Sequence, residues 1–216
     1  MTNICASVER SDYNMDKLTM TELNSNPIIQ FQIWLDEALQ IDMPEPTAMN
    51  LATSSKLGEL SSRMVLLKNV DERGFVFYTN YESKKAADLN ENTQAALCFW
   101  WGLLQRQVRI EGVIEKVSEQ ESDEYFATRP RGSQISAIAS NQSAVIKNYQ
   151  ALRDQVETVE KQFADCEEIP RPEFWGGYRV IPNTIEFWQG RPNRLHDRLK
   201  YKKSADGDWK IERLAP

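Results

Sequence analysis

Hydrophobic residues recur at helical spacing in two long stretches of the chain. The first stretch begins at Asn26-Pro27, where a capping residue precedes the proline favoured at the first position of a helix. Its hydrophobic stripe comprises Ile28, Phe31, Trp34, Leu35, Ala38 and Leu39. The second stripe comprises Tyr149, Leu152, Val156, Val159 and Phe163. This spacing predicts two amphipathic helices that pack one face against a hydrophobic core.

Short hydrophobic runs separated by turn residues fill most of the chain outside these helices. The runs predict strands over residues 48–53, 63–68, 75–79, 94–101 and 105–117. Gly74 and Gly102 fall at expected turns, so successive strands should pair as antiparallel hairpins. A last sheet segment is predicted to open at 174–178 and to end with a strand over 209–214.

Two shorter helices are predicted over residues 83–90 and 118–128. Ser83 and Ser118 are placed to act as their N-caps. Glu121 lies three residues after Ser118, which is the spacing of a capping box, in which each residue's side chain bonds to the other's backbone N–H. The strands and helices together predict an α+β fold in which the sheet is mostly antiparallel and builds a β-barrel.

Two groups of polar residues suggest anion binding. Lys84 and Lys85 stand at a helix start, where cations oppose the helix dipole, and a bound anion would reconcile the two. Tyr125 and Arg129 share one helix face, and Ser133 follows shortly after. A phenol, a guanidinium and a hydroxyl suit a phosphate dianion. The alternative is that these are ordinary helix-end residues that interact with solvent.

A mixed hydrophobic and basic run extends from Ile185 to Arg198 and is interrupted by a turn at Gly190 and Pro192. After the turn, strand alternation would place Arg194, His196 and Arg198 on one side and Leu195 on the other. This basic face, next to Trp188, suits an anionic planar ligand. The alternative is a solvated strand face with a structural histidine.

Composition excludes several classes of function. The net charge is −6 over 216 residues, which argues against general nucleic-acid binding. The three cysteines (Cys5, Cys98 and Cys166) have no paired spacing, and His196 is the only histidine, so no metal site is expected. No hydrophobic run approaches the ~20 residues of a membrane span, and the N-terminus is polar, so a reducing cytoplasm is the expected location.

The run from Ile185 to Arg198 resembles the signature of the pyridoxamine 5'-phosphate oxidase family, FMN enzymes that make pyridoxal 5'-phosphate. The resemblance extends over most of the chain, down to the closing Arg213-Leu214-Ala215-Pro216. It implies the split β-barrel FMN-binding fold with flanking helices, and a homodimer with FMN sites at the subunit interface. Residues 1–26 are polar and weakly patterned, which predicts a flexible N-terminal arm, followed by a single domain over 27–216 that ends in a dimerisation segment.

The same resemblance implies a set of residues that bind FMN. They are Arg63, Met64, Val65, Leu66, Leu67, Lys68, Tyr78, Thr79, Lys84, Lys85, Gln107, Gln142, Ser143, Trp188 and Arg198. Some family members carry arginine where Lys84 stands, and lysine lacks the bidentate fork, so a weaker phosphate contact is expected there. Gln142 and Ser143 are expected to reach FMN from the partner subunit.

The substrate-binding residues implied by the resemblance are Arg10, Tyr13, Lys68, Tyr125, Arg129, Ser133, Arg194, Leu195 and His196. The implied reaction oxidises pyridoxamine 5'-phosphate or pyridoxine 5'-phosphate, with dioxygen as acceptor, and releases hydrogen peroxide, plus ammonia from the amine. Arg194 and His196 are the implied catalytic residues. Histidine can hydrogen-bond or exchange a proton near neutral pH, and both roles stay open for His196.

Two other functions remain as alternatives. A flavin reductase-like split-barrel enzyme that uses a nicotinamide would not need the phosphate-binding group around Tyr125 and Arg129. A non-catalytic protein that stores FMN or pyridoxal phosphate would not need Arg194 and His196 near the reacting carbon. Peroxide release would distinguish an oxidase from a store, and NADH consumption would identify a reductase.

Overall fold

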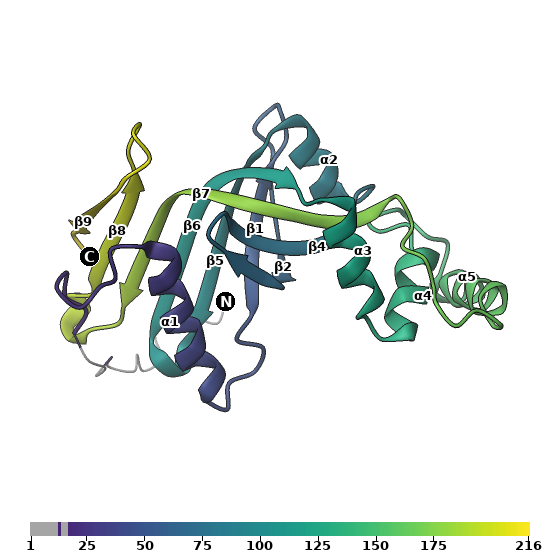
Figure 1. The fold of residues 1–216 in the computed structure, drawn as a ribbon, viewed down its shortest axis with the longest axis horizontal. Coiled ribbons are helices and arrows are strands. Elements are labelled where there is room, and N and C mark those ends of the chain that lie inside the picture. The colour runs from purple at the N-terminus through teal and green to yellow at the C-terminus, as the bar shows by residue number, and fades with distance from the viewer. Residues whose placement is uncertain (1–12, 14–16) are drawn as a thin grey trace, which may run out of the picture. The chain divides into compact units, whose positions relative to one another are not determined.

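The computed structural model describes Tyr13 and residues 17–216. Its helices are α1 (Pro27–Gln40), α2 (Lys84–Glu91), α3 (Glu119–Ala127), α4 (Arg131–Ala139) and α5 (Tyr149–Gln162). Its strands are β1 (Ala48–Ser54), β2 (Leu60–Leu66), β3 (Asn69–Asp71), β4 (Gly74–Asn80), β5 (Gln94–Trp101), β6 (Arg106–Lys116), β7 (Trp175–Gln189), β8 (Asp197–Lys203) and β9 (Trp209–Leu214) (Figure 1). The prediction of an α+β fold is confirmed.

The strands are hydrogen-bonded in the order β2-β1-β5-β6-β7-β4-β3, and β8 pairs with β7 and β9. The chain divides into two compact units. The first unit consists of residues up to 46, 98–110 and 184–216, and the second of residues 47–97 and 111–183. Strands β5, β6 and β7 therefore each contribute residues to both units.

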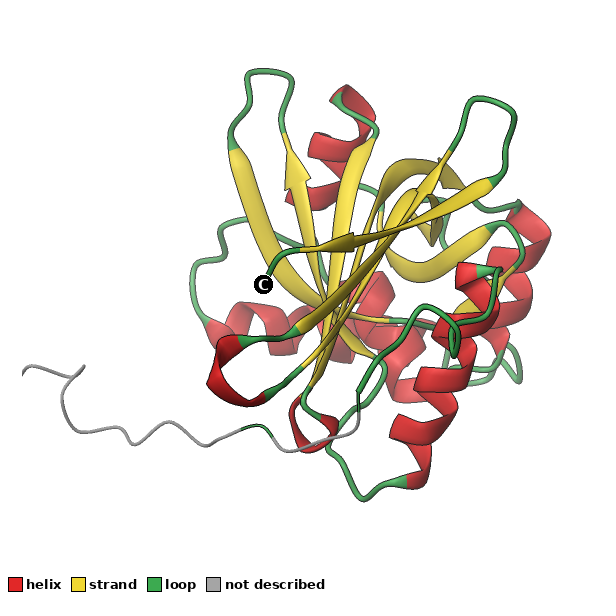
Figure 2. Cartoon of the chain, turned by 90° about the vertical axis from the view of Figure 1, so that its left-hand side faces the viewer, coloured by secondary structure: helices red, strands yellow, loops and turns green. Residues whose placement is uncertain are grey.

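In the first unit, α1 packs through the face that its hydrophobic spacing predicts. Asn26 caps the helix by accepting a hydrogen bond from the Ile28 N–H, and Phe31 and Trp34 are buried against aromatic rings of the sheet. Leu39 was expected in this stripe but is 54% exposed, so that part of the prediction is wrong. The β8–β9 hairpin leads directly to the C-terminus (Figure 2).

In the second unit, β4 lies between β3 and β7, and pairs antiparallel with both. Helices α4 and α5 lie side by side (Figure 1) over a hydrophobic cluster formed by Phe126, Ile135, Ile169 and Trp175. Helix α4 was not predicted. Its sequence, Arg-Gly-Ser-Gln-Ile-Ser-Ala-Ile-Ala, contains a glycine and two serines that weaken the helical signal. Burial of Ile135 in the cluster stabilises it instead.

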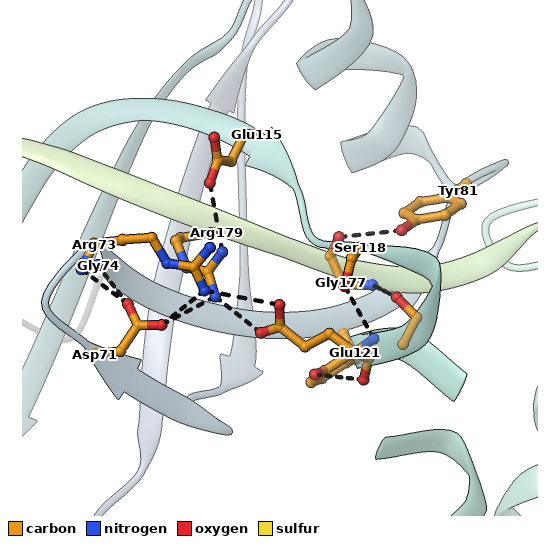
Figure 3. A network of polar contacts seen from close by, with 11 residues as sticks. Asp71, Arg73, Gly74, Tyr81, Glu115, Ser118, Glu121, Gly177 and Arg179 are labelled. Carbon is orange, nitrogen blue, oxygen red and sulfur yellow. Dashed lines mark hydrogen bonds and ion pairs between the residues drawn. The ribbon is translucent and has the colours of Figure 1, made fainter. Parts of the chain in front are cut away.

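An ion-pair network around a buried arginine connects the sheet of the second unit to α3 (Figure 3). Arg179 of β7 has a side chain only 1% exposed and pairs with Asp71, Glu115 and Glu121 at 3.1, 3.4 and 2.9 Å. Ser118 caps α3 by accepting from the Glu121 N–H, as predicted. The Glu121 carboxylate, however, is bound to Arg179, so it does not complete the expected capping box.

Candidate active site

A cavity of about 1280 Å³ lies within the second unit. Strands β2 and β4, the end of α3, and helices α4 and α5 form most of its wall, and residues of α2, of β7 and of the loop after α4 complete it. It gathers most of the residues predicted to bind the cofactor or the substrate phosphate. These are Arg63, Met64, Val65, Leu66, Lys68, Tyr78, Thr79, Lys85, Tyr125, Arg129, Ser133 and Gln142.

Lys85 is the most buried cation of this cavity, with 8% of its surface exposed. Its ammonium donates to the oxygens of Gln142, Thr79 and Ser83 at 2.7, 3.1 and 3.2 Å. All three acceptors are neutral, and no described carboxylate pairs with Lys85. Burial, together with the positive charge of Arg63, lowers the pKa of Lys85 to about 8. A bound anion would compensate this charge.

Arg63 lies on β2 and is held by hydrogen bonds to Thr53 and Ser61 at 2.8 and 2.6 Å. Burial lowers the pKa of Arg63, and the charge of Asp88 opposes this effect. Lys84 is different, because its half-exposed ammonium pairs with the buried Asp88 four residues later. Lys84 does not line the cavity.

The loop after α4 brings Gln142 and Ser143 to the start of α2. Ser143 accepts from the Lys84 backbone N–H at 3.2 Å, and Gln142 accepts from both Lys85 and Thr79. Both residues therefore bond within their own chain, and their contact with FMN of the partner subunit stays a prediction. The two segments are about 60 residues apart in the sequence, so spacing alone could not predict that they lie close together.

The predicted phosphate group assembles at the start of α4. Arg129 follows α3 and donates from Nη2 to the Ser133 carbonyl at 3.0 Å, while Ser133 lies in the first turn of α4. No side chain caps α4 at Pro130, so its first backbone N–H groups can face an anion. Lys68, the fourth predicted member, lies exposed between β2 and β3 and lines the same cavity.

In the first unit, aromatic rings gather around His196. Its ring centroid lies 4.7 Å from that of Trp188 and 5.7 Å from that of Tyr13. The His196 Nδ1 accepts a hydrogen bond from the backbone N–H of Arg191 at 3.1 Å. Neutral His196 therefore carries its proton on Nε2, which leaves that atom as a hydrogen-bond donor.

The predicted strand through Arg194 and His196 is wrong. Residues 192–194 form a 3-10 turn, and β8 begins only at Asp197. Pro192 cannot donate to a strand ladder, and Asn193 and Arg194 adopt left-handed conformations with φ of 56° and 61°. Arg194 and Leu195 consequently lie exposed in the turn, and the predicted common face is absent.

The first unit also contains Arg198 and Gln107, two further residues predicted to bind FMN. Arg198 of β8 pairs with Glu186 at 2.7 Å and donates to the Ala215 carbonyl, which fixes the end of the chain. Asp197 accepts from Arg213. Gln107 is half-buried near the start of β6. Arg10 lies outside the described residues.

Leu67 lies in the second unit, where it is buried, and does not line the cavity. Some cavity residues had no functional prediction. Trp175 was expected only to open a strand, and Tyr149, Leu152 and Val156 only to pack, yet all four line the cavity. Their hydrophobic spacing could not distinguish a core face from a cavity wall. Within the described part of the chain, no helix is long and apolar enough to cross a membrane.

The chemistry of the cavity fits the phosphate of FMN. Lys85 and Arg63 supply two desolvated cations without a buried carboxylate salt bridge of their own, and hydroxyl and amide groups surround them. The second group, at Arg129 and Ser133, fits a further phosphate. The cavity is large enough to take a drug-sized cofactor, since ordinary ligand pockets measure roughly 300–1,000 Å³.

Two protein-family models match the chain. Residues 35–163 match the model described as pyridoxamine 5'-phosphate oxidase, and residues 175–216 match that of the pyridoxine 5'-phosphate oxidase C-terminal dimerisation region. Among curated proteins, the pyridoxine/pyridoxamine 5'-phosphate oxidases of Trichormus variabilis and Salinibacter ruber are 53% and 52% identical to this chain. Each alignment covers 96% of this chain, and 96% and 97% of those proteins.

Two solved structures are also similar. PhzG from Burkholderia lata 383, in complex with tetrahydrophenazine-1-carboxylic acid, has a TM-score of 0.87 at 32% identity, covering 94% of this chain and 99% of its own. A pyridoxamine 5'-phosphate oxidase-related, FMN-binding protein from Nostoc punctiforme has a TM-score of 0.68 at 15% identity, covering 86% and 97%. The split-barrel fold predicted from the sequence is confirmed by these likenesses.

Proposed function

Because this chain belongs to the pyridoxamine 5'-phosphate oxidase family, we propose that it oxidises pyridoxamine 5'-phosphate or pyridoxine 5'-phosphate to pyridoxal 5'-phosphate, a reaction of vitamin B6 metabolism. The observation that carries the proposal is that one cavity contains two separate groups of cationic and hydroxyl side chains, each of which suits a phosphate. One group centres on Lys85 and the other on Arg129. A phosphorylated cofactor and a phosphorylated substrate require two such groups.

Lys85 and Arg63 hold the phosphate of FMN, with Thr79 and Gln142 beside them. When bound, FMN supplies the acceptor for a hydride equivalent from the substrate C4' carbon, and dioxygen takes up the electrons to give hydrogen peroxide. The protein contributes binding, orientation and exclusion of water. Strand β2 contacts the cofactor along its length. The contacts come from backbone and side-chain groups of the β2 residues that line the cavity, among them Met64, Val65 and Leu66.

Arg129, Tyr125 and Ser133 hold the substrate phosphate, together with Lys68. This anchor fixes one end of the pyridine ring, which is half of the orientation problem that the reaction poses. A guanidinium is well suited to the task because it offers several N–H donors in one plane.

In the proposed reaction, Arg194 and His196 act on the ring hydroxyl and the reacting carbon of the substrate. His196 donates from Nε2 to the ring hydroxyl, since its Nδ1 is occupied by the Arg191 N–H. Arg194, exposed in its turn, covers the ring and favours the anionic form of that hydroxyl. The match to a dimerisation region over 175–216 supports a homodimer. The proposal places the FMN sites at the interface of its two subunits.

The direct test adds pyridoxine 5'-phosphate to the FMN-loaded protein in air and follows aldehyde and hydrogen peroxide. Equal amounts of both products are expected. Pyridoxine without the phosphate is the matched control and should react far more slowly, because it cannot use the Arg129 anchor. A protein that is yellow but yields neither product, or that consumes NADH instead, would contradict the proposal.

Three substitutions test the residue assignments. Arg194→Ala and His196→Ala should lower kcat strongly while FMN stays bound, because neither residue lines the cavity that holds its phosphate. Arg129→Ala should mainly raise KM for the phosphate ester, as loss of anchoring does. Full activity in either of the first two variants would refute their catalytic role.

A further inference from the structure

We propose that Trp175 is a positioning residue, which holds Tyr125 and Arg129 in the arrangement that binds the substrate phosphate. The inference rests on the proposed function, since it concerns the phosphate anchor of the same site. Trp175 lies at the start of β7, is 4% exposed, and lines the cavity. It was expected from sequence only to begin a strand.

The first observation is a set of three nearly parallel aromatic rings. Tyr78 and Tyr125 are stacked with centroids 3.9 Å apart and an interplanar angle of 14°. The Trp175 ring is parallel to both, within 10° of Tyr78 and 5° of Tyr125, at 5.5 and 6.2 Å. A side chain in such a stack loses most of its freedom to rotate, so the Tyr125 hydroxyl is held in one direction.

The second observation concerns the guanidinium of Arg129. Its central carbon lies over the Trp175 ring, 4.5 Å from the centroid, and 5.8 Å from that of Phe126. The cation–π contact and the hydrogen bond to the Ser133 carbonyl are its two fixed points. No described carboxylate pairs with Arg129, so the indole holds the cation without neutralising its charge. The remaining N–H donors stay available to an anion.

Trp175 is itself rigidly supported. The backbone N–H of Trp175 donates to the Pro172 carbonyl at 3.0 Å, and the Trp175 backbone carbonyl accepts from the Arg171 guanidinium at 2.7 Å. Arg171 in turn binds Asp123 on α3, the helix that carries Tyr125. A Cβ at Gly177 would stand only 2.8 Å from the Tyr78 ring, so glycine at this position lets the stack approach the strand.

These contacts lower the cost of binding rather than add a new contact to the substrate. A free arginine side chain must be ordered when it binds phosphate, and that ordering reduces affinity. Trp175 orders Arg129 and Tyr125 beforehand. A positioning role of this kind predicts a loss that is specific for the phosphate and that depends on Arg129.

The test measures the dissociation constants of pyridoxal 5'-phosphate and of pyridoxal, which lacks the phosphate, on the FMN-loaded protein by equilibrium dialysis. Trp175→Leu should weaken binding of the phosphate ester about 10-fold and leave pyridoxal nearly unchanged. KM for pyridoxine 5'-phosphate should rise in parallel, with kcat altered much less. Trp175→Phe keeps a ring in the stack and should recover most of the affinity.

The matched control is Trp209→Leu, which removes an indole that lies near Lys203 in the first unit, outside the cavity. It should leave both dissociation constants unchanged. In an Arg129→Ala background, Trp175→Leu should cause a smaller loss of phosphate-ester affinity than in the unaltered protein, because the part of its effect that acts through Arg129 is already absent and only the part through Tyr125 remains. Trp175→Met replaces Trp175→Leu if that variant does not fold.

Three results would overturn the proposal. They are unchanged affinity in a folded Trp175→Leu protein, equal losses for pyridoxal and its phosphate, or full additivity with Arg129→Ala. A wild-type protein that binds pyridoxal 5'-phosphate much better than pyridoxal, yet oxidises neither phosphate ester, would refute the proposed function while the role of Trp175 stands.

Discussion

The second unit contains two buried cations, and they differ in whether carboxylates surround them. Arg179, with 1% of its side chain exposed, is surrounded by Asp71, Glu115 and Glu121. Lys85, with 8% exposed, bonds only to neutral oxygens. Both have been removed from water, which costs free energy unless a counter-charge or hydrogen bonds compensate.

The difference distinguishes a structural cation, Arg179, from a candidate binding cation, Lys85. Around Arg179 the protein supplies the counter-charges itself, and the network joins β7 to β3, β6 and α3 (Figure 3). Around Lys85 no described carboxylate is in place, and the proposed function assigns the missing negative charge to the phosphate of FMN. A desolvated cation in a cavity without a counter-charge is the pattern expected of an anion-binding site.

The largest change is expected in the free energy of unfolding of the Arg179→Ala variant. Removing this guanidinium leaves three carboxylates close together, two of them poorly exposed, and should lower the free energy of unfolding by about 3–5 kcal/mol. Urea denaturation of the FMN-free protein would measure it. Arg73→Ala is the control, because Arg73 also pairs with Asp71 but is exposed, and it should change stability little. Equal stability of the two variants would contradict the structural role of Arg179.

Lys85→Met should weaken FMN binding by about 10- to 100-fold, because a buried charge-assisted hydrogen bond to phosphate contributes roughly 1.5–3 kcal/mol. Fluorescence titration of the FMN-free protein would give the dissociation constant. Lys116→Met removes a lysine of the same unit that lies over Tyr81, outside the cavity, and serves as the control. An unchanged FMN affinity in Lys85→Met would place the cofactor phosphate elsewhere.

Raising the pH should reproduce part of that loss in the unaltered protein. The pKa of Lys85 is about 8 in the FMN-free state, and the phosphate dianion favours the charged ammonium. Below pH 8 the cation is present; above it the proton must be taken up on binding, so the dissociation constant should rise about tenfold between pH 7 and pH 9. The Lys85→Met protein should show no such rise, and a rise of the same size there would assign it to another group.

The smallest change is expected in the FMN affinity of the Lys84→Met variant. The Lys84 ammonium is half-exposed and already pairs with Asp88, so its contribution to FMN affinity should be at most about threefold. The same titration measures it. A loss as large as that of Lys85→Met would mean that Lys84 leaves Asp88 when the cofactor binds, and that both lysines share the phosphate.

Much of the fold was predictable because its signals are local. The caps at Asn26, Ser83 and Ser118 each accept the hydrogen bond that their position predicts. The stripe of α5 begins at Tyr149 as expected. A cap or a stripe depends on residues within a few positions of one another, so sequence spacing is enough to recognise it.

Predictions failed where a local pattern competed with long-range contacts. Alternation suggested an extended chain through Arg194, but Pro192 and the left-handed Asn193 turn the chain before β8 can pair. Helix α4 has a weak local signal and forms because Ile135 is buried in a cluster with Trp175. The Glu121 carboxylate was expected to accept from the backbone N–H of Ser118. It accepts instead from Arg179, 58 residues away in the sequence.

The sequence by itself determined the fold class, the main helices and strands, and which residue types could bind phosphate. Only the tertiary structure decided that Gln142 meets Lys85 within one chain, that Trp175 holds Arg129, and that Lys85 has no described carboxylate partner whereas Arg179 has three. The reason is physical: a residue type and its spacing fix local geometry, whereas the partner of a buried charge is set by strands and loops that are distant in sequence.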